Sequence, residues 1–104
     1  MNIQEIFTKL NETLDKLNAN DIDDPAKLDV EILYLQLKKQ LIFGEIDLLK
    51  EIDKITVADV SKLPRLINQL DADINDENKR TALVNKIVSI AKVTLKAIGL
   101  PIPS

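Results

Sequence analysis

The chain has 104 residues, which is enough for one domain with its own core and too few for two ordinary domains. Apolar residues make up 45% of the chain and aromatic residues only 3%, so Leu, Ile and Val have to build the core. Charged residues make up 30%, the net charge is −3, and histidine and cysteine are both absent, which excludes disulfides, thiolate metal sites and imidazole acid–base catalysis.

The charges are unevenly divided along the chain. Residues 1–76 hold 16 acidic and 9 basic side chains, whereas residues 77–104 hold one acidic side chain, Glu77, and five basic ones. One interpretation is that the two parts attract each other within the fold, and the other is that the basic segment faces an external anion. The net negative charge predicts that nucleic acid is not a partner.

Targeting signals are not evident in the sequence. The first ten residues, MNIQEIFTKL, show no basic region followed by an apolar core, so we expect no secretory signal. The longest unbroken apolar run is ILYL at residues 32–35, far short of the roughly 20 residues that cross a bilayer. We therefore expect a cytoplasmic protein.

The first segment carries apolar residues at spacings of four, three, four and three, which form one stripe on a helix. They are Ile3, Phe7, Leu10, Leu14 and Leu17. This pattern predicts a first helix over about residues 3–18. The polar stretch that follows ends in Asp24 and Pro25, an N-cap followed by a proline at the first helical position, and so predicts the start of a second helix.

Two apolar stripes follow on opposite faces of the second helix, because an offset of two residues is about 200°. The first stripe is Leu28, Ile32, Leu35, Ile42, Ile46 and Leu49, with Lys39 as its only polar member. The second stripe is Val30, Tyr34, Leu37, Leu41, Gly44, Leu48 and Ile55, with Glu51 as its polar gap. Because both stripes pass Gly44 without losing phase, we predict one helix over 25–54, bent at Gly44, with a tight turn there as the alternative.

A third helix is predicted over about residues 57–71, after a capping arrangement of Thr56 and Asp59. Pro64 removes one backbone hydrogen bond and clashes with the preceding turn. We therefore expect this helix to be kinked or split near Pro64, with Ser61 as a new N-cap.

The last helix is predicted over about residues 77–98, where a wide apolar stripe ends at Gly99. Residues 99–104 would form a short tail. The sequence thus predicts an all-α fold, a single domain over residues 1–104 that forms a bundle of four main helices.

The stretch DADINDENKRTA, at residues 71–82, resembles the opening of a calcium-binding loop, with Asp71, Asp73 and Asn75 at positions 1, 3 and 5. The glycine and glutamate required at positions 6 and 12 are replaced by Asp76 and Ala82. We therefore interpret Asp76 as the N-cap of the last helix and expect no metal and no cofactor. The acidic run DIDD at 21–24 is interpreted in the same way, as a solvated linker that ends in a cap.

Catalytic motifs are not recognisable. The three serines do not occur in a Gly-x-Ser-x-Gly turn, and the two glycines are too few for a phosphate-binding loop. The sequence therefore predicts a protein that is not an enzyme.

The functional prediction rests on the second helix, which is apolar on two faces. The first and third helices are shorter and would have to share one of these faces, so we expect part of it to stay uncovered and to form a binding surface. We expect Tyr34, Leu37, Leu41 and Leu48 to contact a second chain, either an identical copy or a target protein. The predicted function is non-enzymatic protein–protein contact of an inhibitor, immunity, adaptor or assembly type, or self-association.

An alternative is peripheral binding to a membrane surface through the last helix. Its basic side chains would be Lys86, Lys92 and Lys96, and its apolar side chains Ile87, Ile90 and Leu95.

Overall fold

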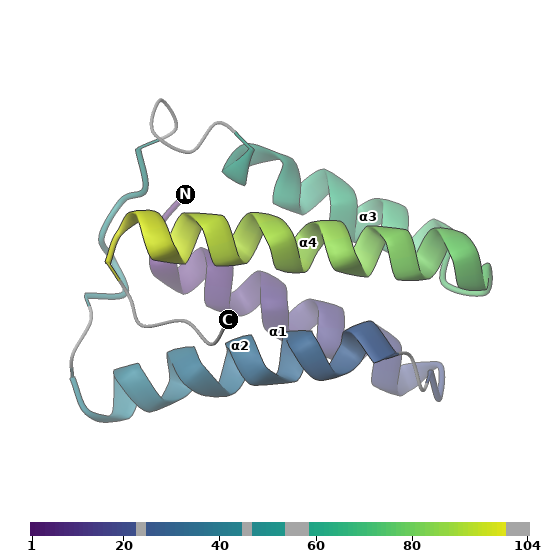
Figure 1. The fold of residues 1–104 in the computed structure, drawn as a ribbon, viewed down its shortest axis with the longest axis horizontal. Helices are drawn as coiled ribbons and strands as arrows, with labels where there is room; N and C mark the ends of the chain where they lie inside the picture. The colour runs from purple at the N-terminus through teal and green to yellow at the C-terminus, as the bar shows by residue number, and fades with distance from the viewer. Residues whose placement is uncertain (23–24, 45–46, 54–58, 100–104) are drawn as a thin grey trace.

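In the computed structural model, which describes residues 1–22, 25–44, 47–53 and 59–99, four α-helices form a bundle (Figure 1). They are α1 (Ile3–Ala19), α2 (Pro25–Ile42), α3 (Leu63–Ala72) and α4 (Glu77–Ala97), and a short 3₁₀ turn, η1 (Val60–Lys62), leads into α3. The bundle measures 36 × 28 × 22 Å. The predicted all-α bundle of four main helices is confirmed.

Each helix has two principal neighbours. α1 packs against α2 and α3, and α4 packs against the same two helices. Successive helices run in opposite directions, and α2 and α3 lie on opposite sides of α4 (Figure 1). The end of α2 and the start of η1 therefore lie at the same end of the bundle, where the N-terminus also lies (Figure 1).

The start of α1 holds part of the connection between α2 and α3 by backbone hydrogen bonds. The N–H of Gln4 donates to the carbonyl of Leu48 at 2.8 Å. The Asn2 side chain is the N-cap of α1 and accepts from the N–H of Glu5 at 2.9 Å. These bonds satisfy first-turn N–H groups that have no partner inside the helix. Ile52, four residues after Leu48, is buried and belongs to the core, so it also anchors this connection.

The core is one aliphatic cluster to which all four helices contribute. Its largest fully buried members are Ile3, Ile6, Leu10, Leu17, Val30, Leu33, Leu37, Leu63, Ile67, Leu70, Ile87 and Leu95. The rings of Phe7 and Tyr34 stack at its margin, with centroids 4.8 Å apart, and join α1 to α2. Complete burial of each such aliphatic side chain stabilises the fold by about 1.5–3 kcal/mol, before the loss of chain entropy is counted.

The predicted continuation of the second helix to residue 54 is wrong, because α2 ends at Ile42. Gly44 has a φ of +65°, in the left-handed region that glycine enters without a steric penalty. The N–H of Gly44 donates to the carbonyl of Leu41 at 3.1 Å and closes the final turn. The alternative prediction, a turn at Gly44, is the one that the structure supports.

The predicted split near Pro64 is confirmed. The chain passes through η1 and enters α3 with Pro64 in the first turn, where its missing N–H leaves no bond unmade. The prediction that Ser61 is the N-cap of this helix is wrong. Lys62 occupies the N-cap position, and its side chain makes no capping bond. Thr56 and the predicted start at residue 57 lie outside the described residues.

The limits of α1 and α4 agree with the predicted limits to within one residue. The predicted N-cap of α4 is confirmed, because an Asp76 carboxylate oxygen accepts from the N–H of Lys79 at 3.2 Å. α2 begins at Pro25, as predicted, whereas its proposed cap Asp24 lies outside the described residues, as do 100–104 of the tail.

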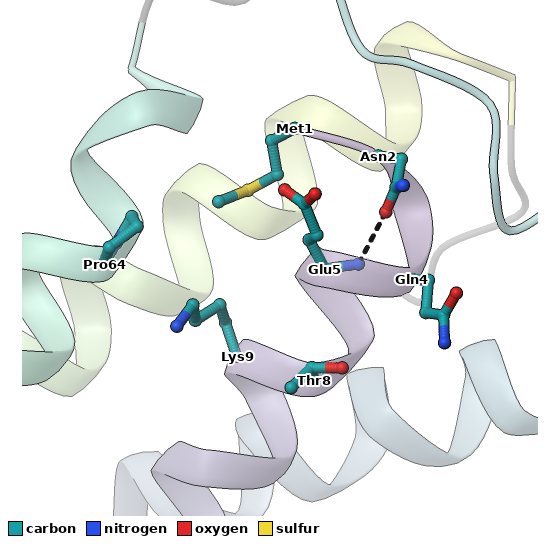
Figure 2. A pocket seen from close by; sticks show the side chains of 7 residues that line it. All are labelled: Met1, Asn2, Gln4, Glu5, Thr8, Lys9 and Pro64. Atoms are coloured by element: carbon teal, nitrogen blue, oxygen red, sulfur yellow. Dashed lines mark hydrogen bonds between the residues drawn. The ribbon is translucent and has the colours of Figure 1, made fainter.

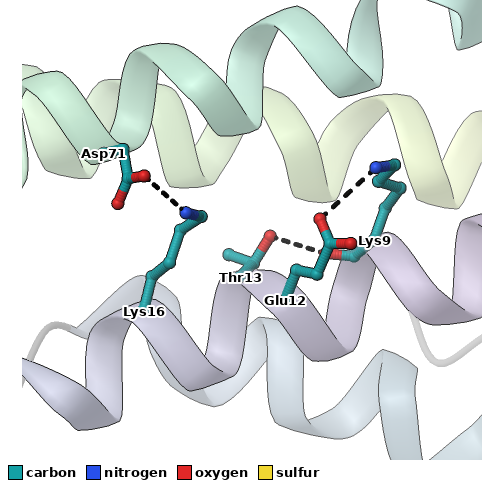
Figure 3. Close-up of polar contacts among 5 residues, drawn as sticks. All are labelled: Lys9, Glu12, Thr13, Lys16 and Asp71. Atoms are coloured by element: carbon teal, nitrogen blue, oxygen red, sulfur yellow. Dashed lines mark hydrogen bonds and ion pairs between the residues drawn. The ribbon is translucent and has the colours of Figure 1, made fainter.

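An ion pair connects α1 to α3, and further polar contacts lie within α1 beside it (Figure 3). The ammonium of Lys16, on α1, lies 2.8 Å from a carboxylate oxygen of Asp71, on α3. Within α1, Lys9 pairs with Glu12 at 3.3 Å, and the Thr13 hydroxyl donates to the Lys9 carbonyl at 2.9 Å. Thr13 is buried, so this internal bond satisfies a hydroxyl that would otherwise lack a partner.

Candidate functional site

The acidic residues that resemble a calcium loop are distributed over two helix ends. Asp71 lies in α3 and pairs with Lys16. Asp73 follows α3 and accepts from the Gln69 side-chain amide at 2.7 Å, while Asp76 caps α4. In the described part of the chain, no three His, Cys, Asp or Glu side chains are grouped as ligands for a metal ion.

An open hollow of about 510 Å³ lies between the first half of α1 and the start of α3 (Figure 2). Its lining residues are Met1, Asn2, Gln4, Glu5, Thr8, Lys9 and Pro64. Two of the polar side chains here have structural partners: the Asn2 side chain caps α1, and Lys9 pairs with Glu12. Glu5 and Thr8 are exposed, so the hollow lacks the buried, convergent polar groups typical of a ligand site.

Asp59, at the N-terminal end of η1, has the clearest electrostatic perturbation. Its carboxylate lies 2.9 Å from the Lys62 ammonium. The hydrogen bond and the charge of Lys62 lower the pKa of the Asp59 carboxyl below its usual value of 3.8, and Lys86 lowers it further. Because Asp59 is exposed, this pair is a local surface contact and does not define a catalytic site.

The four residues predicted to contact a partner do not form one exposed surface. Leu37 is fully buried in the core of this chain and contributes no exposed surface to the predicted partner-binding face. Tyr34 is half-buried against Phe7, and Leu48 packs partly buried against the core. Leu41 is exposed, near the end of α2. The stripe that contains Tyr34 and Leu37 is thus the side of α2 that packs within this chain.

The opposite stripe of α2 is exposed instead. We call Leu28, Ile32, Leu35, Lys39 and Ile42 the outer face of α2. The exposed fractions of its four apolar members are 60% for Leu28, 38% for Ile32, 58% for Leu35 and 70% for Ile42. At about 100° per residue, these five positions lie within about 80° of one another and extend over about 21 Å of helix. Large exposed apolar residues continue beyond α2 at Phe43 and Leu49.

Buried residues on the other side of α2 define how this helix is oriented. They are Ala26, Val30, Leu33, Leu37 and Gln40. These positions also lie within about 80° of one another, and their centre is about 160° from that of the outer face. The core therefore fixes α2 with its outer face directed away from the bundle.

The sequence contains one signal that distinguishes the two stripes of α2. Within the helix limits, the outer stripe contains a charged residue, Lys39, whereas the packed stripe contains none. Lysine is almost never fully buried without a partner, so its stripe is the better candidate for exposure. Lys39 is exposed.

Charged residues border the outer face. Glu31 is half-buried and Lys38 is exposed, and both lie along the edge nearer Tyr34. Toward α4, Asp29 lines an open hollow of about 400 Å³ together with Lys92, Val93 and Lys96. Val93 itself is 58% exposed. The outer face is thus an apolar strip with charges of both signs along its borders.

The apolar residues required for membrane binding through α4 lie in the core. Ile87, Ile90 and Leu95 are buried, whereas Lys86 and Lys96 are exposed. Among the described residues, no helix combines the length and the apolar composition needed to cross a bilayer. Comparison of the chain with protein-family models, with curated proteins and with solved structures found no match.

Proposed function

We propose that this chain is a non-enzymatic protein that acts by protein–protein contact through the outer face of α2. The observation that carries this proposal is the exposure of Leu28, Ile32, Leu35 and Ile42 along one side of a single helix. Contiguous exposed apolar surface on a small domain is typical of an interaction site. The contact is of an inhibitor, immunity, adaptor or assembly type, or a self-association, and we propose that it takes place in the cytoplasm.

Burial of the outer face would supply the free energy of binding. Covering apolar surface contributes about 25 cal/mol per Å² removed from water. Leu33 and Leu37 hold α2 from the opposite side, so little conformational entropy is lost when a partner packs on the outer face. An apolar strip on a preformed helix matches the helix-in-groove and helix-on-helix modes of recognition.

Charges at the border of the outer face would select among partners. Glu31 and Lys38 lie beside the apolar strip, where a partner with the opposite arrangement of charges would be favoured. Lys39 lies within the strip and is exposed, and its long aliphatic stem would cover apolar surface of a partner while its ammonium stays in water.

Binding to a membrane surface through α4 is a weaker proposal. Ile87, Ile90 and Leu95 would have to leave the core to reach a bilayer, which would expose most of one wall of the bundle. The outer face of α2 is accessible without unfolding. We therefore propose the protein contact in preference to the membrane contact.

Site-specific photo-cross-linking tests the proposed function. A benzophenone amino acid replaces Leu35 in one variant and Asn68, an exposed residue of α3, in a matched control. α2 and α3 lie on opposite sides of α4, so the two probes sample different surfaces (Figure 1). Each variant is irradiated both as purified protein and in extract of the source cell. We expect discrete protein adducts from position 35 only, and an absence of adducts in both samples would contradict the proposal.

A further inference from the structure

The outer face of α2 has the spacing of a coiled-coil seam. Leu28, Ile32, Leu35, Lys39 and Ile42 are separated by four, three, four and three residues, the alternation of the d and a positions of a heptad. Two heptads are too short to associate as isolated peptides. α2 is already held in a folded bundle, so the cost of forming the helix is met before association.

Lys39 disfavours a parallel, in-register pairing of two outer faces. In a parallel, in-register pair each residue meets its own counterpart, so the ammonium groups of two Lys39 side chains would face each other inside the seam. In an antiparallel pair, a positions face d positions of the second helix. If Ile32 faces Leu35 of the second copy, then Lys39 faces Leu28 of the second copy and no like charges meet.

The border charges select the same antiparallel register. In this register the flanking residue Glu31 lies opposite Lys38 of the second copy, and two-fold symmetry repeats the contact. Moving the helices by one heptad step, so that Leu35 faces Lys39 of the second copy, would place Lys38 opposite Lys38. Opposite charges across the border therefore favour one register, and like charges disfavour the alternative.

We infer that the partner of the outer face is a second copy of this chain, bound with its α2 antiparallel and with the two-fold axis between residues 33 and 34. This inference rests on the proposed function and specifies its partner. A single pair of helices, in contact over about 21 Å, gives an interface at the low end of specific interfaces, which bury roughly 1,200–2,000 Å² in total. The dimer is therefore in equilibrium with the monomer, and its population rises with protein concentration.

Charge exchange at Glu31 and Lys38 tests the antiparallel register. Glu31→Lys alone and Lys38→Glu alone each create two like-charge contacts per dimer, so each raises the dissociation constant roughly tenfold, as measured by sedimentation velocity. An equimolar mixture of the two variants restores both contacts in a heterodimer, and so does the Glu31→Lys/Lys38→Glu double variant. Circular dichroism verifies that each variant keeps its helix content.

The outcomes separate this inference from the proposed function. Recovery of wild-type affinity in the mixture supports the antiparallel register. A mixture that dimerises no better than the single variants overturns this register. If substitution of Leu35 still weakens the dimer in that case, the proposed contact surface remains supported. A wild-type protein that stays monomeric at all concentrations overturns the homodimer, and adducts of other proteins at position 35 would then support the proposed function alone.

Disulfide trapping gives an independent test, since the chain has no cysteine of its own. Leu28→Cys and Lys39→Cys are made as separate variants. In the antiparallel register position 28 faces position 39 of the second copy, while the two copies of position 28 are about 16 Å apart along the helix axis. A disulfide forms only when the two variants are mixed. Rapid self-cross-linking of each variant alone would instead indicate a parallel dimer and overturn the inference.

Discussion

Leu35 and Leu37 are separated by one residue on α2 and lie on opposite faces of the helix, with Leu35 58% exposed and Leu37 completely buried. The same residue type therefore serves two purposes within one turn. Leu37 belongs to the core side of α2, the helix that packs against α1 and α4, and Leu35 belongs to the strip that we propose as a contact surface. A helix with apolar residues on opposite faces is usually covered on both of them. In α2 the core covers one face, and we propose that another molecule covers the other.

This pair gives a matched test of the core. Leu37→Ala leaves a cavity among close-packed aliphatic side chains, so we expect it to lower the free energy of unfolding by about 2–5 kcal/mol. Leu35→Ala removes an exposed side chain, and we expect a change within about 0.5 kcal/mol for the monomer. Urea unfolding at low protein concentration measures both. Equal losses from the two variants would show that Leu35 is packed within the chain.

Gly44 ends α2 through its left-handed backbone, with a φ of +65°. A Cβ added there would meet no atom within 4 Å, so any cost of substitution comes from the backbone and not from a clash. We expect Gly44→Ala to destabilise the protein by about 1 kcal/mol and Gly44→Asn by less, because asparagine tolerates this conformation. Thermal unfolding tests this order. An alanine variant as stable as the wild type would mean that the helix continues through residue 44.

The Lys16–Asp71 ion pair joins α1 to α3 at 2.8 Å (Figure 3). Both side chains are partly solvated, so a double-mutant cycle with Lys16→Ala and Asp71→Ala should give a coupling free energy of about 0.2–1 kcal/mol. We expect 1 M NaCl to reduce it, because salt screens partly exposed charges. A coupling of zero at low salt would mean that the pair does not persist in solution.

Asp59 provides a test of local electrostatics. Its hydrogen bond to Lys62 lowers the pKa of the carboxyl below 3.8, so the stability that it contributes is present above this value and is lost as the pH falls through the lowered pKa. In Lys62→Met we expect the pKa of Asp59 to rise toward 3.8, as measured by NMR titration of the carboxyl carbon. Lys86→Met serves as the matched control and should raise it less. An unchanged pKa in Lys62→Met would contradict the contact.

Helices with strong boundary signals are the ones that the sequence predicts well. α1 has a single apolar stripe, and α4 has Asp76 as an N-cap and Gly99 after its last turn, so the predicted and observed limits nearly coincide. The effect of Pro64 is also predictable, since proline without an N–H is accommodated only in the first turn of a helix.

The end of α2 and its exposed side could not be predicted in the same way. Leu48 and Leu49 continue the heptad spacing after the helix has ended, although in the connection Leu48 instead packs partly buried against the core. Periodicity alone does not distinguish a helix from an apolar connection of matching phase. α2 has apolar stripes on both faces, so its apolar pattern does not show whether Leu35 or Leu37 is buried. The neighbouring helices decide this, and their positions are a property of the assembled bundle.

The most direct test of the central claim is the solution mass of the wild-type protein and of Leu35→Glu, measured by sedimentation velocity over a wide concentration range. Leu35 is exposed, so the substitution should leave the fold intact, and circular dichroism verifies this. We predict that the wild-type mass rises with concentration from 11.7 kDa toward twice that value, while Leu35→Glu remains at 11.7 kDa. Masses that rise equally for both proteins, or that stay at 11.7 kDa for both, would contradict self-association through the outer face of α2.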